Sequence, residues 1–196
     1  EVALYHYLTY LTTPAPLTLF DGIYKLPAGH FMMIEANGNF AAERYWGAVP
    51  GQSLDAHTVA GKSNADQDQY YQQAVMDQLE ASVEKRMMSD APYGAFLSGG
   101  IDSSVNVALM DRFTDDPVNT FTVGFKDHQH LNELDHASHV ANHFKTNHNE
   151  VLVDEQDMVG YLDELVHHQD EPLADWVCIP LHFVSKLAHE NGVKVV

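Results

Sequence analysis

The chain has 196 residues, 45% of them hydrophobic, and a formal net charge of −18 at pH 7. This length is enough for one domain and a smaller part, since domains usually contain about 100 to 200 residues. The acidic charge excludes a basic surface for nucleic acid, the single cysteine excludes a disulfide framework, and no apolar run is long enough to span a membrane. We expect a soluble, cytoplasmic protein with neither nucleic-acid nor membrane partners.

Residues 1–54 are expected to form a small, β-rich part. Aromatic and apolar residues alternate in Val2–Tyr10, and turn-forming residues follow. Further along, Phe31–Glu35 and Phe40–Tyr45 are separated by Asn37-Gly38, the dipeptide that favours a tight hairpin turn. This pattern predicts a two-stranded hairpin that closes the part.

The polar, aperiodic residues 51–68 predict a linker, and we place the domain boundary near residue 55. A helix is expected from Gln69, with one apolar stripe that covers a sheet. The stripe consists of Tyr71, Val75, Leu79, Val83 and Met87. Beyond it, predicted strands (93–97, 118–125, 148–153, 193–196) alternate with predicted helices (102–112, 133–144, 155–168, 178–191). Such alternation predicts an α/β fold with a doubly wound, mostly parallel sheet, whose ligands bind at the carboxyl ends of the strands.

A glycine-rich loop with the sequence SGGIDSS, residues 98–104, follows the first of these strands and leads into a helix. Its glycines let several backbone N–H groups face one anion, and its serines add hydroxyl donors. These residues are Ser98, Gly99, Gly100, Ser103 and Ser104. The helix N-terminus adds unpaired N–H groups and about half a positive charge, which suits phosphate. Asp102 fits such a site if a magnesium ion bridges its carboxylate to phosphate oxygens. The alternative is a glycine turn before a capped helix, which requires no ligand.

Two other segments have more than one interpretation. Thr120–Phe125 is a β-rich strand whose exit, Val123-Gly124, would lie beside the end of the first strand and hold an adenine ring. It would equally fit a core strand that ends in a glycine turn. Asp170-Glu171 precede a proline that ends the helix before them. Their carboxylates could bind magnesium, orient a substrate amine, or lie in a solvated loop.

Thirteen histidines raise the alternative of a metal-binding protein. His136, His139 and His143 share one helical face, a spacing that could hold a transition metal, and other histidines lie nearby in sequence. These are His128, His130 and His148. The same helix carries an apolar core stripe, so we expect these histidines to face solvent rather than form a ligand set. Cys178 lies in an apolar run and is expected to be buried and inert.

Five segments occur in one order along the chain. They are Leu26–His30, Arg44–Trp46, Ser98–Ser104, Thr120–Phe125 and Asp170–Ala174. Together they resemble the glutamine-hydrolysing asparagine synthetase family, and the glycine-rich loop resembles the pyrophosphate loop of the ATP pyrophosphatases. The resemblance implies an adenine nucleotide alpha hydrolase fold, preceded by the end of an N-terminal-nucleophile glutaminase domain. It implies a fragment, in which residues 1–54 end the glutaminase domain and residues 55–196 begin a truncated synthetase domain.

The resemblance implies the functional residues as well. The cofactor-binding set is Leu97, Ser98, Gly99, Gly100, Asp102, Ser103, Ser104, Val123 and Gly124. In this set the loop surrounds the β and γ phosphates of ATP, the backbone at Leu97 and Val123 holds adenine, and Asp102 binds Mg²⁺. Asp170 and Glu171 are expected near the active site. No catalytic residue is assigned within these 196 residues.

The implied activity is an ATP-dependent ligase that makes asparagine from aspartate, ATP and ammonia released from glutamine, through an aspartyl adenylate. Two alternatives stay open beside the metal-binding protein described above. One is a related amidotransferase that forms a β-lactam, cyclises a peptide or modifies a polysaccharide, and the other is a noncatalytic nucleotide-binding module. The expected partners are these small molecules, and a homodimer of the full-length protein is left open.

Overall fold

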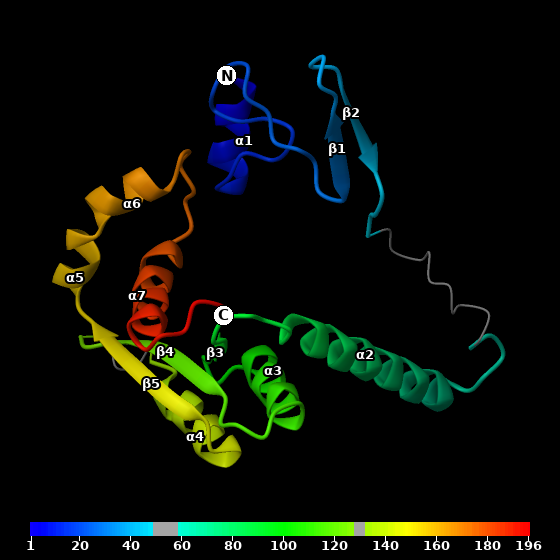
Figure 1. The fold of residues 1–196 in the computed structure, drawn as a ribbon, viewed down its shortest axis with the longest axis vertical. Helices are drawn as coiled ribbons and strands as arrows, with labels where there is room; N and C mark the ends of the chain where they lie inside the picture. The colour runs from blue at the N-terminus through cyan, green and yellow to red at the C-terminus, as the bar shows by residue number, and fades with distance from the viewer. Residues whose placement is uncertain (49–58, 128–131) are drawn as a thin grey trace. The chain divides into compact units, whose positions relative to one another are not determined.

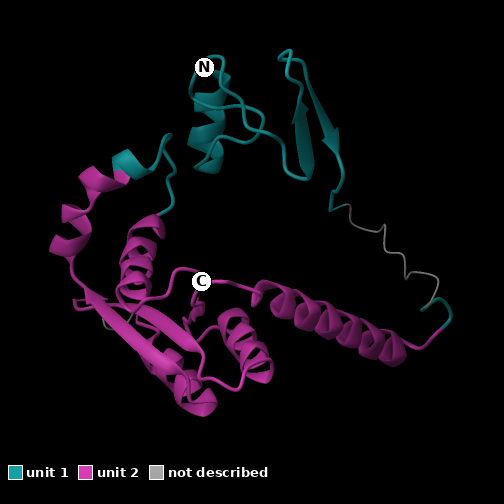
Figure 2. Cartoon of the chain, viewed as in Figure 1, with its two compact units in different colours: residues 1–61, 166–175 teal, residues 62–165, 176–196 magenta. Residues whose placement is uncertain are grey.

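The computed structural model describes residues 1–48, 59–127 and 132–196. It divides the chain into two compact units (Figure 2). Unit 1 contains residues 1–61 and 166–175, and unit 2 contains residues 62–165 and 176–196. The boundary predicted near residue 55 lies outside the described residues. In the described part of the chain, no helix has both the length and the apolar character needed to cross a membrane.

Unit 1 combines one helix with one hairpin. Helix α1 spans Val2–Tyr10, and strands β1 (His30–Ile34) and β2 (Phe40–Arg44) pair antiparallel, which confirms the predicted hairpin. The expectation that this part is β-rich is wrong for residues 2–10, which form α1. The segment is almost entirely apolar, so it has no clear period of two or 3.6 residues by which the sequence could distinguish a strand from a helix. The hairpin turn also differs from the two-residue type, since only Gly38 has positive φ there and its N–H donates to the Glu35 carbonyl at 2.9 Å.

Unit 2 is built on a parallel sheet in the order β3-β4-β5, which confirms the predicted α/β class. The strands are β3 (Gly94–Phe96), β4 (Asn119–Phe125) and β5 (Asn147–Val153). The strand predicted at 193–196 is reduced to one parallel bridge between Tyr93 and Val195. The first residue of this segment, Val193, packs in the core beside Val184 and Ala188 of the last helix.

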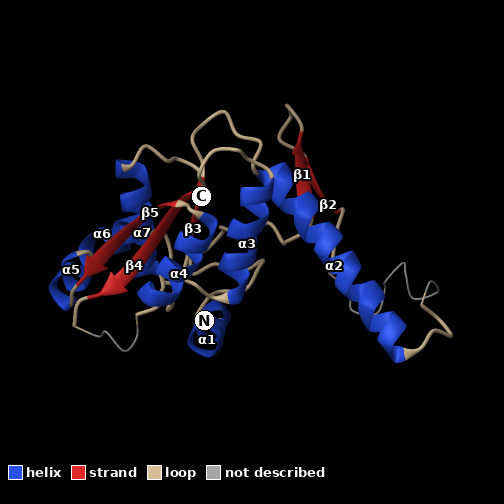
Figure 3. Ribbon diagram, turned by 90° about the horizontal axis from the view of Figure 1, so that it is seen from below, coloured by secondary structure: helices blue, strands red, loops and turns tan. Residues whose placement is uncertain are grey.

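Helices cover both faces of this sheet (Figures 1 and 3). On one face lie α3 (Ile101–Arg112) and α4 (Leu134–Phe144), which share a core with the end of β3. That core contains Leu97, Val107, Ala137 and Ala141. On the other face, α7 (Cys178–Glu190) packs Val184 and Ala188 against Phe121 of β4. Because side chains alternate along a strand, the neighbours of Phe121 face α3 and α4.

Helix α2 (Asn64–Arg86) differs from its prediction in two ways. It begins inside the predicted linker, where the Ser63 hydroxyl accepts a hydrogen bond from the Asp66 N–H and caps it. Only its end joins the core: Val83 is buried in a cluster with α3, and Met87 packs against that cluster. The other residues of the predicted stripe, Tyr71, Val75 and Leu79, are exposed. The four-residue spacing identifies an apolar face but not the element that covers it.

The helix predicted at 155–168 is two helices, α5 (Glu155–Gly160) and α6 (Leu162–His168). The break follows Gly160, a residue that is costly inside a helix. It lets the buried Tyr161 ring stack on His182 of α7, with 3.7 Å between ring centroids. Cys178 is half-buried rather than buried, because it begins α7 where the helix leaves the core.

Candidate nucleotide-binding site

The SGGIDSS loop joins the end of β3 to the start of α3 and makes a close approach to α4. Gly99 has a φ of 80°, and a Cβ at this position would lie 2.5 Å from the Cβ of His136 and 2.6 Å from the Ala137 nitrogen. Contacts this short require a neighbouring atom to move. The turn therefore needs glycine for both its backbone conformation and its packing.

The first turn of α3 has free N–H groups because its N-cap residue, Gly100, has no side chain to cap them. Helices α1, α4 and α7 likewise have no side-chain cap, whereas α2 and α5 are capped by Ser63 and Asp154. The surrounding surface is open, since Ser98, Gly100, Ile101 and Asp102 are exposed. An open loop with unpaired donors and the positive end of a helix dipole can accept an anion.

The serine hydroxyls hold the loop in shape. Ser98 Oγ lies 3.0 Å from Ser103 Oγ and accepts from the Gly100 N–H at 3.2 Å, while Ser103 Oγ donates to the Gly100 carbonyl at 3.2 Å. Ser104 Oγ is buried and has no hydrogen-bond partner within the described residues. The loop is therefore ordered by its own side chains before any ligand binds.

A cavity of about 1140 Å³ opens beside the loop, at the carboxyl ends of β3, β4 and β5. Four of the predicted cofactor-binding residues line it, namely Leu97, Ser98, Ser103 and Val123. Gly124 is buried and packs under Leu134 of α4, since a Cβ there would lie 2.6 Å from the leucine Cδ1. Most of the other walls are apolar, from β4, α5 and α7. Such a space suits a flat, largely apolar group near a polar anchor.

The backbone of Val123 faces an open edge of β4. The Leu97 N–H donates to the Phe121 carbonyl at 2.9 Å, whereas the Lys126 N–H donates to the Val153 carbonyl of β5. The backbone N–H and C=O groups of odd-numbered residues of β4 therefore face β3, and those of even-numbered residues face β5. Because β3 ends at Phe96, Val123 has no ladder partner on that side. In the part of the chain that the structure describes, its N–H and C=O have no hydrogen-bond partner.

Among the described residues, the charged side chains that line the cavity are all acidic. Asp127, Glu133, Asp154 and Glu155 line it, and none of the lining residues that the structure describes is a lysine, arginine or histidine. Lys126 lies next to it but is paired with Asp154 and Asp157 at 2.9 and 3.3 Å. The Asp157 N–H and Lys126 hold the pKa of Asp154 below its ordinary value, and Asp154 raises the pKa of Lys126. A triphosphate here would depend on N–H groups and a bound cation rather than on basic side chains.

Comparisons with known proteins show the family to which the sequence belongs. The sequence profile of the asparagine synthase family matches residues 74–196. The chain belongs to the asparagine synthase family. A Bacillus subtilis asparagine synthetase of the glutamine-hydrolysing type is 32% identical over 191 residues, which are 96% of this chain and 28% of that protein. A Mycobacterium tuberculosis protein, named as a candidate enzyme of the same type, is 36% identical over 195 residues, 99% of this chain and 28% of its own length.

The asparagine synthase-family chain thus spans somewhat over a quarter of the length of these relatives. Among solved structures, an NH3-dependent NAD synthetase from Campylobacter jejuni matches with a TM-score of 0.41 and 17% sequence identity. The match covers 63% of this chain and 54% of the synthetase.

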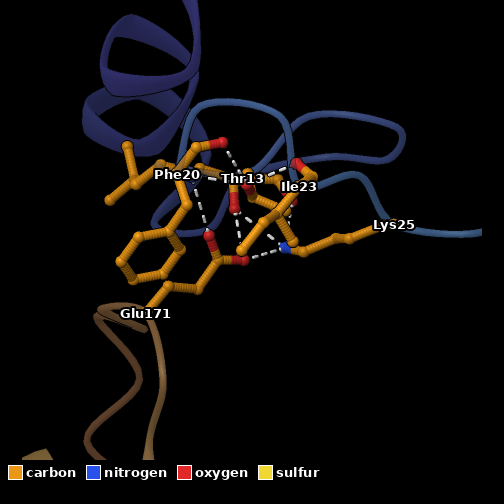
Figure 4. Close-up of polar contacts among 7 residues, drawn as sticks. Thr13, Phe20, Ile23, Lys25 and Glu171 are labelled. Atoms are coloured by element: carbon orange, nitrogen blue, oxygen red, sulfur yellow. Dashed lines mark hydrogen bonds and ion pairs between the residues drawn. The ribbon is translucent and has the colours of Figure 1, made fainter.

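The two adjacent carboxylates Asp170 and Glu171 lie in unit 1. Asp170 is exposed, whereas Glu171 bonds to other residues of the unit (Figure 4). The Thr13 hydroxyl donates to one carboxylate oxygen of Glu171 at 2.7 Å, the Leu19 N–H donates to the other at 3.1 Å, and Lys25 forms an ion pair. Lys25 and Thr13 hold the pKa of Glu171 below its ordinary value. Glu171 is therefore not in a solvated loop, and a role for the pair in magnesium binding stays a prediction.

The histidines of α4 face solvent, as expected, because His136, His139 and His143 are all exposed. His128 and His130 lie outside the described residues. Across residues 1–48, 59–127 and 132–196, no three His, Cys, Asp or Glu side chains gather as a metal cluster would. His148 instead contacts Thr120 and Glu150, at 2.9 and 3.2 Å.

Sequence reasoning missed two side chains that shape the candidate site. Asn132 clasps the backbone of Phe125, accepting from its N–H at 2.6 Å and donating to its carbonyl at 2.9 Å. Thr122 is buried and donates a hydrogen bond to the Leu97 carbonyl. No local pattern marks either role, because both depend on how β4 meets its neighbours.

Proposed function

We propose that this chain is the ATP-binding part of an ATP-dependent amidotransferase ligase that makes asparagine from aspartate, ATP and glutamine-derived ammonia. The observation that carries the proposal is the open loop of residues 98–104, with an uncapped helix start behind it and a cavity beside it. Membership of the asparagine synthase family supports the reaction class. The related β-lactam-forming, peptide-cyclising and polysaccharide-modifying amidotransferases remain the alternative.

In this proposal residues 55–196 begin a synthetase domain of the adenine nucleotide alpha hydrolase type, and residues 1–54 end a glutaminase domain. The parallel sheet with helices on both faces supports the first assignment. Alignment with about a quarter of each longer relative supports a multidomain protein. We assign the enzyme to the cytoplasm.

Most of the predicted residues then have a task that their positions support. The N–H groups at the start of α3 bind the β and γ phosphates. The hydroxyls of Ser98 and Ser103, which bond to each other in this structure, turn to the phosphates when ATP binds. Gly99 and Gly100 allow the backbone to approach them. The adenine ring lies against Leu97 and accepts and donates hydrogen bonds at the Val123 backbone, where an edge is open.

Magnesium fits the donor set of this loop. Asp102 is exposed in the first turn of α3, and among the described residues no cation pairs with its carboxylate. Magnesium in nucleotide sites commonly takes one or two carboxylates together with phosphate oxygens, so a cluster of several protein ligands is not needed. Asp102 would hold the ion, which would neutralise phosphate charge beside the acidic cavity.

The proposed chemistry has two steps. A side-chain carboxylate oxygen of aspartate attacks the α phosphorus of ATP, the bond to the β-phosphate oxygen breaks, and pyrophosphate leaves. Ammonia then attacks the acyl carbon and AMP leaves. Donors fixed before the reaction stabilise the charge that develops on pyrophosphate, and loss of one such donor raises a barrier by about 3 kcal/mol in well-studied cases.

Nucleotide binding by the 196-residue chain tests the proposal. Ile101 is 83% exposed at the start of α3, so Ile101→Glu places a carboxylate beside the phosphates without disturbing the core. We expect this variant to weaken ATP binding on the order of tenfold in calorimetric titrations with magnesium. Val75→Glu on α2, where valine is 59% exposed, is the matched control and should bind like the wild type. Equal affinities of the two variants would contradict the assignment of the loop.

A further inference from the structure

Thr122 makes a hydrogen bond that bears on the proposed adenine site. Its hydroxyl donates to the carbonyl oxygen of Leu97, and both residues are buried. In a continuing parallel ladder, that carbonyl would instead accept from the Val123 N–H, as the next rung after the bond from the Leu97 N–H to the Phe121 carbonyl. The Thr122 side chain therefore replaces one rung between β3 and β4.

We propose that Thr122 is a positioning residue for nucleotide recognition, which occupies the Leu97 carbonyl and so keeps the Val123 edge open for an adenine base. This inference rests on the proposed function and names the residue that makes the same site selective. Adenine carries an amino donor beside a ring-nitrogen acceptor, which complement the C=O and N–H of Val123. Guanine presents an acceptor and a donor in the opposite order.

Removal of the hydroxyl should close this edge. In Thr122→Val the Leu97 carbonyl loses its donor, and a buried carbonyl without a partner is unfavourable. The donor that parallel pairing supplies is the Val123 N–H, so the two strands gain one rung. The base then meets an N–H group that is already bonded. Thr122→Ser keeps the hydroxyl and should keep the edge open.

The test compares three ligands and three proteins by calorimetric titration of the full chain with magnesium. For Thr122→Val we expect ATP affinity to fall about tenfold, which is what one or two hydrogen bonds contribute. Affinity for inorganic pyrophosphate should not change, because the loop that binds it is intact, and the preference for ATP over GTP should shrink. Thr122→Ser should match the wild type with all three ligands.

Amide hydrogen exchange supplies a second measurement, which tests the wild type by itself and then the variant. In the wild type, the Val123 amide should exchange faster than that of Phe121, and ATP but not pyrophosphate should slow it. A Val123 amide that is already protected without nucleotide would overturn the inference. In Thr122→Val the same amide should become protected without ligand.

The outcomes separate this inference from the function on which it rests. Unchanged ATP affinity and unchanged Val123 exchange in Thr122→Val would overturn the role of Thr122 and leave nucleotide binding standing. A parallel loss of pyrophosphate binding would overturn it too, because it would indicate general damage to the loop. A wild-type chain that binds neither ATP nor pyrophosphate would contradict the proposed function itself.

Discussion

Replacing Gly99 with alanine tests the packing of the SGGIDSS loop against α4. Two costs add at this position. An alanine at the positive φ of Gly99 costs about 1–2 kcal/mol. Its Cβ would also lie 2.5–2.6 Å from atoms of His136 and Ala137, and overpacking of this kind costs roughly another 1–3 kcal/mol. We expect Gly99→Ala to lower the free energy of unfolding by about 2–5 kcal/mol.

Gly192→Ala is the matched control, because Gly192 has the same φ of 80° but no atom within 4 Å of an added Cβ. It should lose only the conformational part, about 1–2 kcal/mol. Urea unfolding followed by circular dichroism measures both variants, and equal slopes against urea concentration allow the comparison. If Gly99→Ala loses no more stability than Gly192→Ala, the close approach of the loop to α4 is wrong.

Three further predictions concern charged and metal-binding groups. In a full-length homologue, replacing the aspartate that corresponds to Asp102 with asparagine removes the proposed magnesium ligand. This change should abolish ATP–pyrophosphate exchange and spare glutamine hydrolysis. An unchanged exchange rate would refute that role. Because the folded-state pKa of Glu171 is lowered, its contribution to stability is complete above the ordinary pKa of 4.5 and is lost as pH falls through the folded-state value. Glu171→Gln should therefore unfold in urea with a weaker acid dependence than the wild type, and identical pH profiles would contradict the ion pair with Lys25. Replacing His136, His139 and His143 with glutamine should leave zinc uptake in equilibrium dialysis unchanged, whereas a loss would favour the metal-binding alternative.

The alternation of strands and helices in unit 2 could be predicted from the sequence because each element there has a local signal. Most predicted bounds, such as 102–112 against Ile101–Arg112 for α3, agree with the structure to within one residue. Helix α2 shows where local signals stop. Its stripe marks an apolar face, but burial depends on a partner element, and in the described structure only the end near Val83 has one.

The candidate site divides in the same way. The loop could be predicted because a glycine turn between a strand and a helix is encoded within seven neighbouring residues. The binding of Glu171 could not, because its partner Thr13 lies 158 residues away along the chain. Likewise Thr122 and Leu97 are 25 residues apart, and their contact exists only once β3 and β4 are paired.

Along β4, the backbone groups of Phe121, Val123 and Phe125 face the side of β3, and their hydrogen bonds explain why the edge is open at Val123. The carbonyl of Phe121 is taken by Leu97, and both backbone groups of Phe125 are taken by the Asn132 amide. Between them, Val123 would complete the ladder if the Thr122 hydroxyl did not already occupy the Leu97 carbonyl. Ligands of a parallel sheet bind at the carboxyl ends of its strands, where strand pairing ends. Here the side chains of Thr122 and Asn132 bond to the neighbouring backbone groups, so that Val123 alone of these three residues is left unpaired within the described part of the chain. Under the proposed function, the selectivity of the site is therefore set by residues that need not touch the ligand.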